Sequence, residues 1–339
     1  MSSDYMIVED HGTGGLLSKR LLDDVIVPKL KPVYLGKMED SGIAPVLGNT
    51  LAMTTDSFVI DPIFFGNGDI GKLAICGTVN DLAVSGATPK YLTLAFILEE
   101  GFLISELSRI LDSICKEAQE ANVYILAGDT KVVGKGDVDK IYINTAGVGF
   151  FAPDQAPLSL SKINKDDHLI ITGHVGNHGI HILSFRDGLG FETKVLSDCA
   201  PLNKVIQDVL SEFGEGIHYM RDITRGGVGC ILNEIAAEIG FSIYLNESSI
   251  PMQQETVMAA EMLGIDPLYL ANEGNLAIFC SPDISEKLVA LLSQYDYTQN
   301  ASVCGSVQAT ETTGTFLVTK EGSTRIINSF EGMQLARLC

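Results

Sequence analysis

Short apolar runs of strand length alternate along this chain with segments of helical periodicity, and this alternation restricts the fold more than any other feature. Strands that alternate with helices are typical of α/β architectures, in which helices cover a sheet. In the first half, we expect strands at residues 51–60, 91–99, 123–127 and 141–150, with helices at 70–85 and 104–121.

Residues 151–157 contain two prolines and are typical of a linker. The alternation resumes after them, with strands expected at 168–172, 217–221, 241–245, 275–280 and 315–318, and helices at 178–186, 201–212, 226–239, 252–263 and 284–294. We therefore predict an α/β (α+β) protein of two domains, each a sheet covered by helices, at 1–150 and 151–328, with a flexible tail at 329–339.

The composition is that of a water-soluble chain of ample size. With 339 residues and 46% hydrophobic content, two domains can each have a core. No window reaches the roughly 18 unbroken apolar residues of a membrane span, and the first residues lack the basic and apolar regions of a signal peptide. The 7 cysteines are widely spaced, which favours free thiols over disulfides or a zinc site. We expect a cytoplasmic protein.

The charge balance restricts the partners. With 43 acidic against 23 basic side chains, the formal net charge of −20 would repel a nucleic acid backbone. For the same reason, an anionic substrate such as a nucleoside triphosphate would enter with Mg²⁺. A high acidic content is also a common means of keeping a protein soluble.

Three aspartates recur beside small residues. Asp56 is expected at the end of a strand, Asp129 is expected just after another, and Asp81 follows Asn80 inside an apolar, small-residue helix. An unpaired carboxylate in such a helix would be costly to bury. Three carboxylates that converge at one sheet edge would bind Mg²⁺ through oxygen. The ordinary alternative is that these aspartates cap turns and helices.

Two glycine-rich segments are candidates for phosphate binding, because the chain has neither a Walker loop nor a strand-linked Gly-x-Gly-x-x-Gly. One is residues 11–15, which begin with His11 and Gly12. The other is residues 221–229, which precede a predicted helix. The second segment combines backbone N–H groups with a helix N-terminus, and this geometry suits phosphate.

Cys339 lies in a C-terminal stretch that is too short and mixed to predict a packed element. A tail from residue 331 onward could extend about 30 Å, at roughly 3.3 Å per residue, so its thiol could visit more than one site. Its own α-carboxylate disfavours the thiolate. The ordinary alternative is an incidental cysteine in a frayed terminus.

Seven short motifs, in order along the chain, resemble those of the HypE family of hydrogenase maturation factors. They are His-Gly-Thr-Gly-Gly at 11–15, Thr-Thr-Asp at 54–56, Val-Asn-Asp-Leu-Ala at 79–83, Gly-Asp-Thr-Lys-Val-Val at 128–133, Asp-Ile-Thr-Arg-Gly-Gly at 222–227, Asn-Glu-Gly at 272–274 and Arg-Leu-Cys at 337–339. The inner motifs are shared with aminoimidazole ribonucleotide synthetase, selenophosphate synthetase and thiamin monophosphate kinase. The cysteine at 339 is what distinguishes the HypE family.

The resemblance implies a two-domain aminoimidazole ribonucleotide synthetase-like fold and an ATP-dependent carbamoyl dehydratase. A partner, the carbamoyltransferase HypF, would carbamoylate Cys339, and this chain would convert the S-carboxamide to an S-thiocyanate, which gives cyanide to the hydrogenase iron through a HypC–HypD complex. The resemblance also implies a homodimer. The implied catalytic residues are Cys339, Lys131 and Glu273, and the implied Mg²⁺ ligands are Asp56, Asp81, Asp129 and Asp222. The implied nucleotide-binding residues add His11, Gly12, Asn80, Thr130, Thr224, Gly226 and Gly227.

Other interpretations remain open from the residues alone. A sister ATP enzyme is one, although a selenophosphate synthetase would carry a cysteine near the first glycine motif, and the first here is Cys76. A noncatalytic carrier of the Cys339 thiol is another. His174, His178 and His181 are expected to be structural or surface histidines rather than metal ligands.

Overall fold

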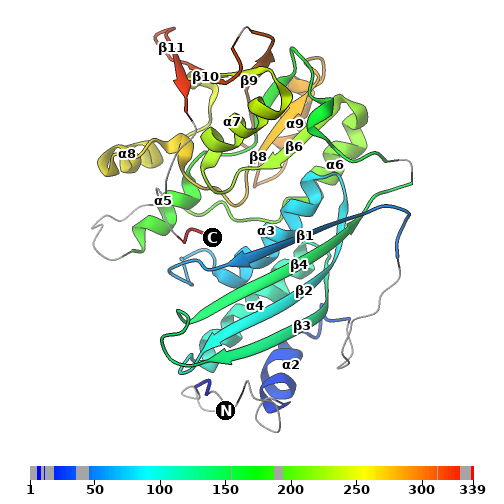
Figure 1. Ribbon diagram of the computed structural model, residues 1–339, viewed down its shortest axis with the longest axis vertical. Coiled ribbons are helices and arrows are strands. Elements are labelled where there is room, and N and C mark those ends of the chain that lie inside the picture. The colour runs from blue at the N-terminus through cyan, green and yellow to red at the C-terminus, as the bar shows by residue number, and fades with distance from the viewer. Residues whose placement is uncertain are drawn as a thin grey trace. The chain divides into compact units, whose positions relative to one another are not determined.

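The computed structural model describes residues 6–8, 11, 19–35, 46–153, 155–186, 194–310, 312–328 and 337–339. The described residues form two compact units, each with its own sheet (Figure 1). The first contains the described residues up to Leu82, together with Ala87–Gln155 and Cys339. The second contains Ala83–Gly86 and Ala156–Leu338.

The first unit has a four-stranded sheet in the order β1-β4-β2-β3. β4 runs antiparallel to both of its neighbours, and β2 and β3 are parallel. The edge strands are therefore β1 and β3. The bounds are β1 (Leu51–Phe58), β2 (Thr88–Glu99), β3 (Tyr124–Val133) and β4 (Ile141–Phe150).

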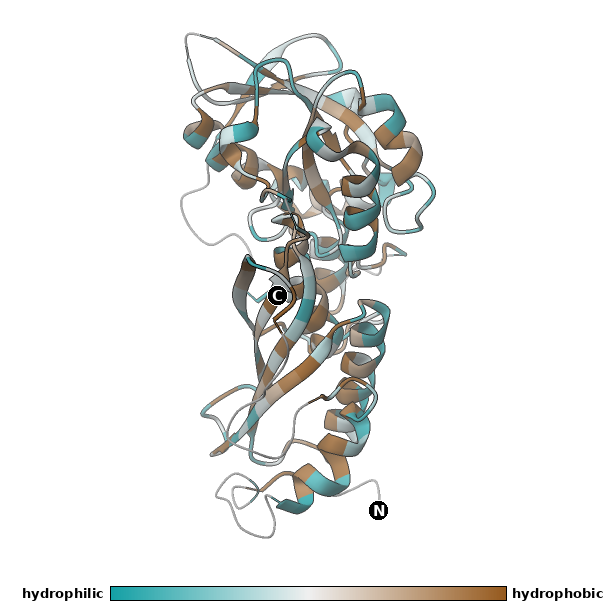
Figure 2. Cartoon of the chain, turned by 90° about the vertical axis from the view of Figure 1, so that its right-hand side faces the viewer, coloured by the Kyte–Doolittle hydropathy of each residue, from teal (hydrophilic) through white to brown (hydrophobic). Residues whose placement is uncertain are grey.

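Helices α3 (Ile70–Val84) and α4 (Ile104–Glu120) lie along one face of this sheet (Figure 1). A Cβ added at Gly71 would lie 2.6 Å from the Ile110 carbonyl oxygen, so a glycine is needed where these helices cross. Figure 2 shows hydrophobic residues on the strands and on the helix sides that face them. On the other face, Met53 is 70% exposed and Ile97 is 38% exposed, so no described helix covers it.

A short helical segment precedes this sheet, with a π-helical turn η2 (Leu22–Ile26) followed by α2 (Val27–Leu30). Lys29 of α2 forms an ion pair of 2.7 Å with Asp112 of α4. Both side chains are exposed, so the pair contributes little to stability.

The second unit has a seven-stranded sheet in the order β11-β10-β7-β9-β5-β8-β6. All neighbouring pairs are antiparallel except β7 and β10. Its strands are β5 (His168–Ile171), β6 (Ile217–Asp222), β7 (Ser242–Asn246), β8 (Leu276–Cys280), β9 (Ser302–Gln308), β10 (Thr315–Val318) and β11 (Thr324–Ile327). Its helices are α5 (Asn177–Ser184), α6 (Asn203–Phe213), α7 (Gly227–Ile239), α8 (Gln254–Leu263) and α9 (Ser285–Leu292), with single 3₁₀ turns η3 (Leu160–Lys162), η4 (Gly214–Gly216), η5 (Glu247–Ser249) and η6 (Pro267–Tyr269).

Two cores lie on opposite faces of this second sheet. Leu169 and Phe279 contribute to a core with α7, whereas their neighbours Ile170 and Ile278 contribute to a core with α6 and α9. Successive strand residues point to opposite faces. The interior strand β8, between β5 and β6, is buried at every position because both faces are covered.

The predicted α/β alternation is confirmed, with most element ends within two residues of expectation. One prediction was wrong, and two strands were missed. β3 runs on to Val133, so Asp129 lies inside the strand rather than after it, and β9 and β11 were not predicted. β9 alternates Ser and Gly with apolar residues, and β11 is a four-residue strand with only two apolar residues, so neither contains a long apolar run. None of the helices in the described ranges has the length and hydrophobicity to cross a membrane.

Candidate functional site

Two of the predicted carboxylates lie between β1 and α3. The Thr54 hydroxyl donates a 2.8 Å hydrogen bond to Asp81 Oδ2. The Thr78 hydroxyl is 3.4 Å from Asp56 Oδ2. Asn80, which precedes Asp81 on α3, is buried. Asp81 therefore has a polar partner in its small-residue helix, and both carboxylates lie on the helix-covered side of the sheet.

The third predicted carboxylate lies on the opposite side of the same sheet. Asp129 pairs across the ladder with Ala95, and Lys131 pairs with Ile97 on the open face. Lys131 Nζ is 3.3 Å from Asp129 Oδ2, and these side chains are 65% and 62% exposed. The Thr130 backbone N–H donates 2.9 Å to Asp129 Oδ1. The result is a solvent-facing group of a lysine and a carboxylate.

The register of the sheet separates these two acidic sites. Asp56 lies opposite Thr145 on β4, which lies opposite Leu94 on β2 and then Gly128 on β3. Asp56 and Asp129 are thus about three strand spacings apart, or roughly 14 Å. The expectation that three carboxylates converge at one sheet edge is wrong for a single chain, because β1 and β3 are opposite edges. Among the described residues, no three His, Cys, Asp or Glu side chains form a metal-binding group.

The first glycine-rich segment is visible only at its start. His11 is buried, and its Nδ1 accepts a 3.0 Å hydrogen bond from the Val8 backbone N–H. Gly12 and the rest of that motif lie outside the described residues. The predicted phosphate-binding role of this segment therefore stays a prediction.

The second glycine-rich segment forms a tight turn between β6 and α7. Asp222 ends β6, and Gly226 and Gly227 have φ of 77° and 59°, the left-handed region that favours glycine. The Thr224 carbonyl accepts a 3.0 Å hydrogen bond from the Gly227 N–H. A Cβ at Gly227 would lie 2.5 Å from the Leu268 carbonyl oxygen. The glycine is therefore required for close packing against residues 268–270, and the turn leads into the N-terminus of a 13-residue helix, a position that favours anions.

Glu273 lies in a turn that wraps around a residue missed by the sequence analysis, Asp198. The Glu273 N–H donates a 3.0 Å hydrogen bond to Asp198 Oδ1, and Asn272 Nδ2 donates a 2.9 Å hydrogen bond to Asp198 Oδ2. A Cβ at Gly274 would lie 1.8 Å from the Asp198 carbonyl oxygen, so only glycine fits there. Burial raises the pKa of Asp198 above its ordinary value, although these hydrogen bonds oppose the shift.

This turn holds Glu273 firmly. Asn272 also connects the turn to the segment before α5. Its Nδ2 donates a 3.0 Å hydrogen bond to the His174 carbonyl, and its Oδ1 accepts a 3.1 Å hydrogen bond from the Gly176 N–H. The Glu273 side chain is 4% exposed. A buried carboxylate on a fixed backbone suits a general base. Asp198 carried no sequence signal of its own, because it sits in a segment without a motif.

The C-terminal residues 337–339 are described, and hydrogen bonds hold their backbone. In the second unit, His178 Nε2 lies 2.7 Å from the Leu338 carbonyl oxygen, and Arg186 Nη2 donates 2.6 Å to the Arg337 carbonyl oxygen. In the first unit, the Val59 N–H donates 3.1 Å to the Cys339 carbonyl oxygen. Cys339 is partly exposed, and neither it nor any of the other six cysteines, all of which lie in the described ranges, forms a disulfide.

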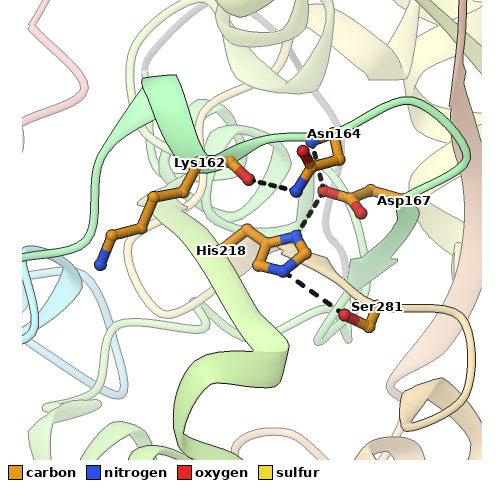
Figure 3. Close-up of polar contacts among 5 residues, drawn as sticks. All are labelled: Lys162, Asn164, Asp167, His218 and Ser281. Atoms are coloured by element: carbon orange, nitrogen blue, oxygen red, sulfur yellow. Dashed lines mark hydrogen bonds and ion pairs between the residues drawn. The ribbon is translucent and has the colours of Figure 1, made fainter.

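A further polar cluster lies outside the predicted residues (Figure 3). His218 Nδ1 is 2.7 Å from Asp167 Oδ2, and His218 Nε2 is 3.4 Å from the Ser281 hydroxyl. Asp167 Oδ2 also accepts 2.8 Å from the Asn164 N–H. This order of groups resembles a hydrolytic triad, but the Ser281 contact is long. The cluster connects the start of β5 with β6 and the end of β8.

Comparisons with known proteins agree with this architecture. Residues 38–151 match the family model "AIR synthase related protein, N-terminal domain", and residues 164–317 match its C-terminal counterpart. The chain is 39% identical to the carbamoyl dehydratase HypE of Rhizobium leguminosarum bv. viciae, over 97% of this chain and 94% of the relative.

Solved structures give the same match. A crystal structure of the hydrogenase maturation protein HypE in complex with ATP superposes with a TM-score of 0.93 at 40% identity, covering 98% of this chain and 99% of that one. A HypE chain from a crystal structure of a HypE–HypF complex superposes with a TM-score of 0.79 at 40% identity, covering 93% of this chain and 100% of that one. The similarity therefore covers both units.

Proposed function

Because the chain belongs to the HypE family and is a carbamoyl dehydratase of hydrogenase maturation, we propose that its substrate is an S-carboxamide on its own Cys339. The observation that carries the proposal is the 39% identity to a carbamoyl dehydratase over 97% of the chain. The product would be an S-thiocyanate, whose cyanide passes to the iron of a hydrogenase. Aminoimidazole ribonucleotide, selenophosphate and thiamin phosphate chemistry, as well as a noncatalytic carrier, are less consistent with this identity.

The reaction removes the elements of water from the carboxamide. The C–O bond breaks, nitrogen loses two protons and a C≡N bond forms, while ATP becomes ADP and inorganic phosphate with the carboxamide oxygen in the phosphate. ATP supplies the phosphoryl group that makes this oxygen a good leaving group. The relative crystallised with ATP supports this cosubstrate.

We assign the binding of the nucleotide and its magnesium ion to the predicted site residues. Gly226 and Gly227 form the tight turn that begins α7, and the backbone N–H groups at this helix N-terminus suit phosphate oxygens. Asp56, Asp81, Asp129 and Asp222 supply the carboxylate oxygens that Mg²⁺ prefers, and the ion would offset the triphosphate charge. Asn80, Thr130, Thr224, His11 and Gly12 complete the proposed nucleotide-binding set.

Two side chains are proposed to assist the reaction, one as a general base and one by stabilising negative charge. Glu273, buried on the Asp198-bound turn, would take protons from the carboxamide nitrogen. Lys131 would stabilise negative charge that develops on the phosphoryl oxygens. Cys339 carries the reacting group, and no bond to its sulfur forms or breaks during dehydration.

A homodimer would combine acidic sites that one chain keeps apart. Asp56 and Asp129 lie at opposite edges of the four-stranded sheet, and the open face between them exposes Met53 at 70%. Two such faces packed together would bury these apolar side chains. A two-fold axis would then bring the β1 edge of one protomer to the β3 edge of its partner.

The proposed partners act before and after this step. HypF would carbamoylate Cys339, in line with the relative crystallised with HypF, and a HypC–HypD complex would accept the cyanide. None of the seven cysteines, all of them in the described ranges, forms a disulfide, which suits a reducing compartment such as the cytoplasm.

The decisive experiment follows the mass of the intact protein with HypF, carbamoyl phosphate and ATP, with peptide mapping of the C-terminus. We expect carbamoyl addition to Cys339 and then an ATP-dependent loss of one water, neither of which occurs in Cys339→Ala. ATP consumption with an unmodified Cys339 would instead indicate a small-molecule substrate. Carbamoylation without water loss would indicate a carrier.

A further inference from the structure

Two side chains of the second unit bind the backbone just before Cys339. Arg186 donates to the Arg337 carbonyl oxygen and His178 contacts the Leu338 carbonyl oxygen, at 2.6 Å and 2.7 Å. The Leu338 side chain is buried. We call these contacts, together with Ser197 behind His178, the tail dock. The histidine that the sequence analysis regarded as structural therefore contacts the segment that bears the proposed reacting group.

The hydrogen bonds behind His178 fix which ring nitrogen carries the proton. A carbonyl oxygen only accepts, so Nε2 must be the donor to Leu338. His178 Nδ1 is 2.7 Å from the Ser197 hydroxyl, which itself accepts 3.1 Å from the Cys199 N–H. Ser197 can therefore donate to Nδ1 of a neutral ring. His178 is fully buried, and burial lowers its pKa to about 4, which keeps the ring neutral near pH 7.

We propose that the tail dock positions Cys339 for its ATP-dependent dehydration, with His178 and Arg186 as positioning residues. This inference rests on the proposed function, which gives Cys339 its chemistry. Both hydrogen bonds of the dock are to main-chain carbonyls of residues 337 and 338, so they do not involve the group attached to the Cys339 sulfur. It can therefore hold the tail before and after modification. Two hydrogen bonds can also be released when the tail visits a partner.

The first test measures how freely the tail leaves the dock. The full-length protein is treated with iodoacetamide, and alkylation of Cys339 is followed by peptide mass spectrometry, with Cys115, which is also partly exposed, as internal reference. We expect alkylation of Cys339 to be roughly fivefold faster in His178→Leu and in Arg186→Ala, because each loses one hydrogen bond to the tail.

His181→Leu is the matched control. His181 is a buried histidine on the same helix, but its Nδ1 bonds to the Val195 carbonyl rather than to the tail. We expect its Cys339 alkylation rate to stay within about twofold of wild type. Labelling of the buried Cys280 and Cys304 would reveal any variant that unfolds. Arg186 is not fully buried, so Arg186→Ala tests the dock without a change in the core.

The second test measures dehydration of carbamoylated Cys339 in a single turnover. We expect water loss to be about fivefold slower in His178→Leu, and to recover in His178→Gln, whose amide nitrogen can still donate. Equal alkylation and dehydration rates in wild type, His178→Leu and Arg186→Ala would overturn the proposal. Faster alkylation with unchanged dehydration would refute the positioning role. A wild-type protein that never loses water would refute the proposed function instead, and alkylation would still decide whether the dock exists.

Discussion

Asp56 and Asp129 lie in neighbouring rows of one four-stranded sheet but at its opposite edges and on its opposite faces. One chain cannot place both carboxylates on one magnesium ion, since three strand spacings separate them by roughly 14 Å. If both carboxylates bind the same ion, then two protomers must contribute to each site.

Mixed dimers test this shared site. We expect Asp56→Asn and Asp129→Asn to be inactive as separate homodimers. A purified heterodimer of the two variants has one site with both carboxylates intact, so it should recover about half of the wild-type dehydration rate. Sites built within one chain would give no recovery, because each protomer would lack one carboxylate.

The turn before α7 should be intolerant of a single methyl group. In Gly227→Ala, the new Cβ would lie 2.5 Å from the Leu268 carbonyl oxygen, at a φ of 59°. We expect a loss of about 2–4 kcal/mol in the free energy of unfolding, measured in urea, and weaker ATP binding by calorimetry.

Gly240→Ala is the matched control at the other end of α7. Its φ is 70°, but a Cβ there meets nothing within 4 Å. We expect a loss of about 1 kcal/mol from backbone strain and unchanged ATP affinity. Equal effects of Gly227→Ala and Gly240→Ala on ATP affinity would contradict the assignment of the α7 turn to phosphate binding.

The sequence could predict the α/β alternation and the glycine turn, because both depend on local periodicity and on local backbone conformation. It could not predict that Asp129 lies inside β3, since the polar segment after Ala127 has weak strand propensity and is held by pairing with β2. The sequence also could not predict that β1 and β3 are the edge strands of the sheet, because this depends on the strand order.

The residues around the candidate site were harder to find because they are brought together by contacts between distant parts of the sequence. Asp198 meets Asn272 and Glu273 across more than 70 positions, and His178 meets Leu338 across 160. No short motif records such contacts. The catalytic roles of Glu273 and Cys339 were assigned only through family resemblance, whereas the residues that contact them came from the structure.

The Asp167–His218 pair should stabilise the second unit. Asp167 has 3% of its side chain exposed, so loss of its 2.7 Å histidine partner leaves a buried carboxylate short of a donor. We expect His218→Ala to lower the free energy of unfolding by about 1–3 kcal/mol, measured in urea. Ser281→Ala, which loses only a 3.4 Å contact, should cost less than about 0.5 kcal/mol. Similar losses in both variants would show that the serine contact matters equally.

His178 should make the stability of the protein depend on pH. Burial, with a smaller contribution from the nearby His181, lowers its pKa to about 4, whereas the hydrogen bond to Leu338 opposes the shift. In the unfolded chain its pKa would be about 6.5. Below that value the unfolded chain binds a proton that the folded chain does not, so folding loses stability as the pH falls from about 6.5 toward 4.

The comparison with His178→Gln isolates this contribution from the other titrating groups. The wild-type advantage in the free energy of unfolding should be fully present above about pH 7 and should shrink by roughly 1 kcal/mol at pH 5.5. Urea unfolding of both proteins at these two pH values measures the difference. The carboxyl of Asp198, whose pKa is raised, is present in both proteins and cancels. An advantage that stays constant between the two pH values would mean that His178 binds the same number of protons in the folded and unfolded chains, and that burial does not lower its pKa.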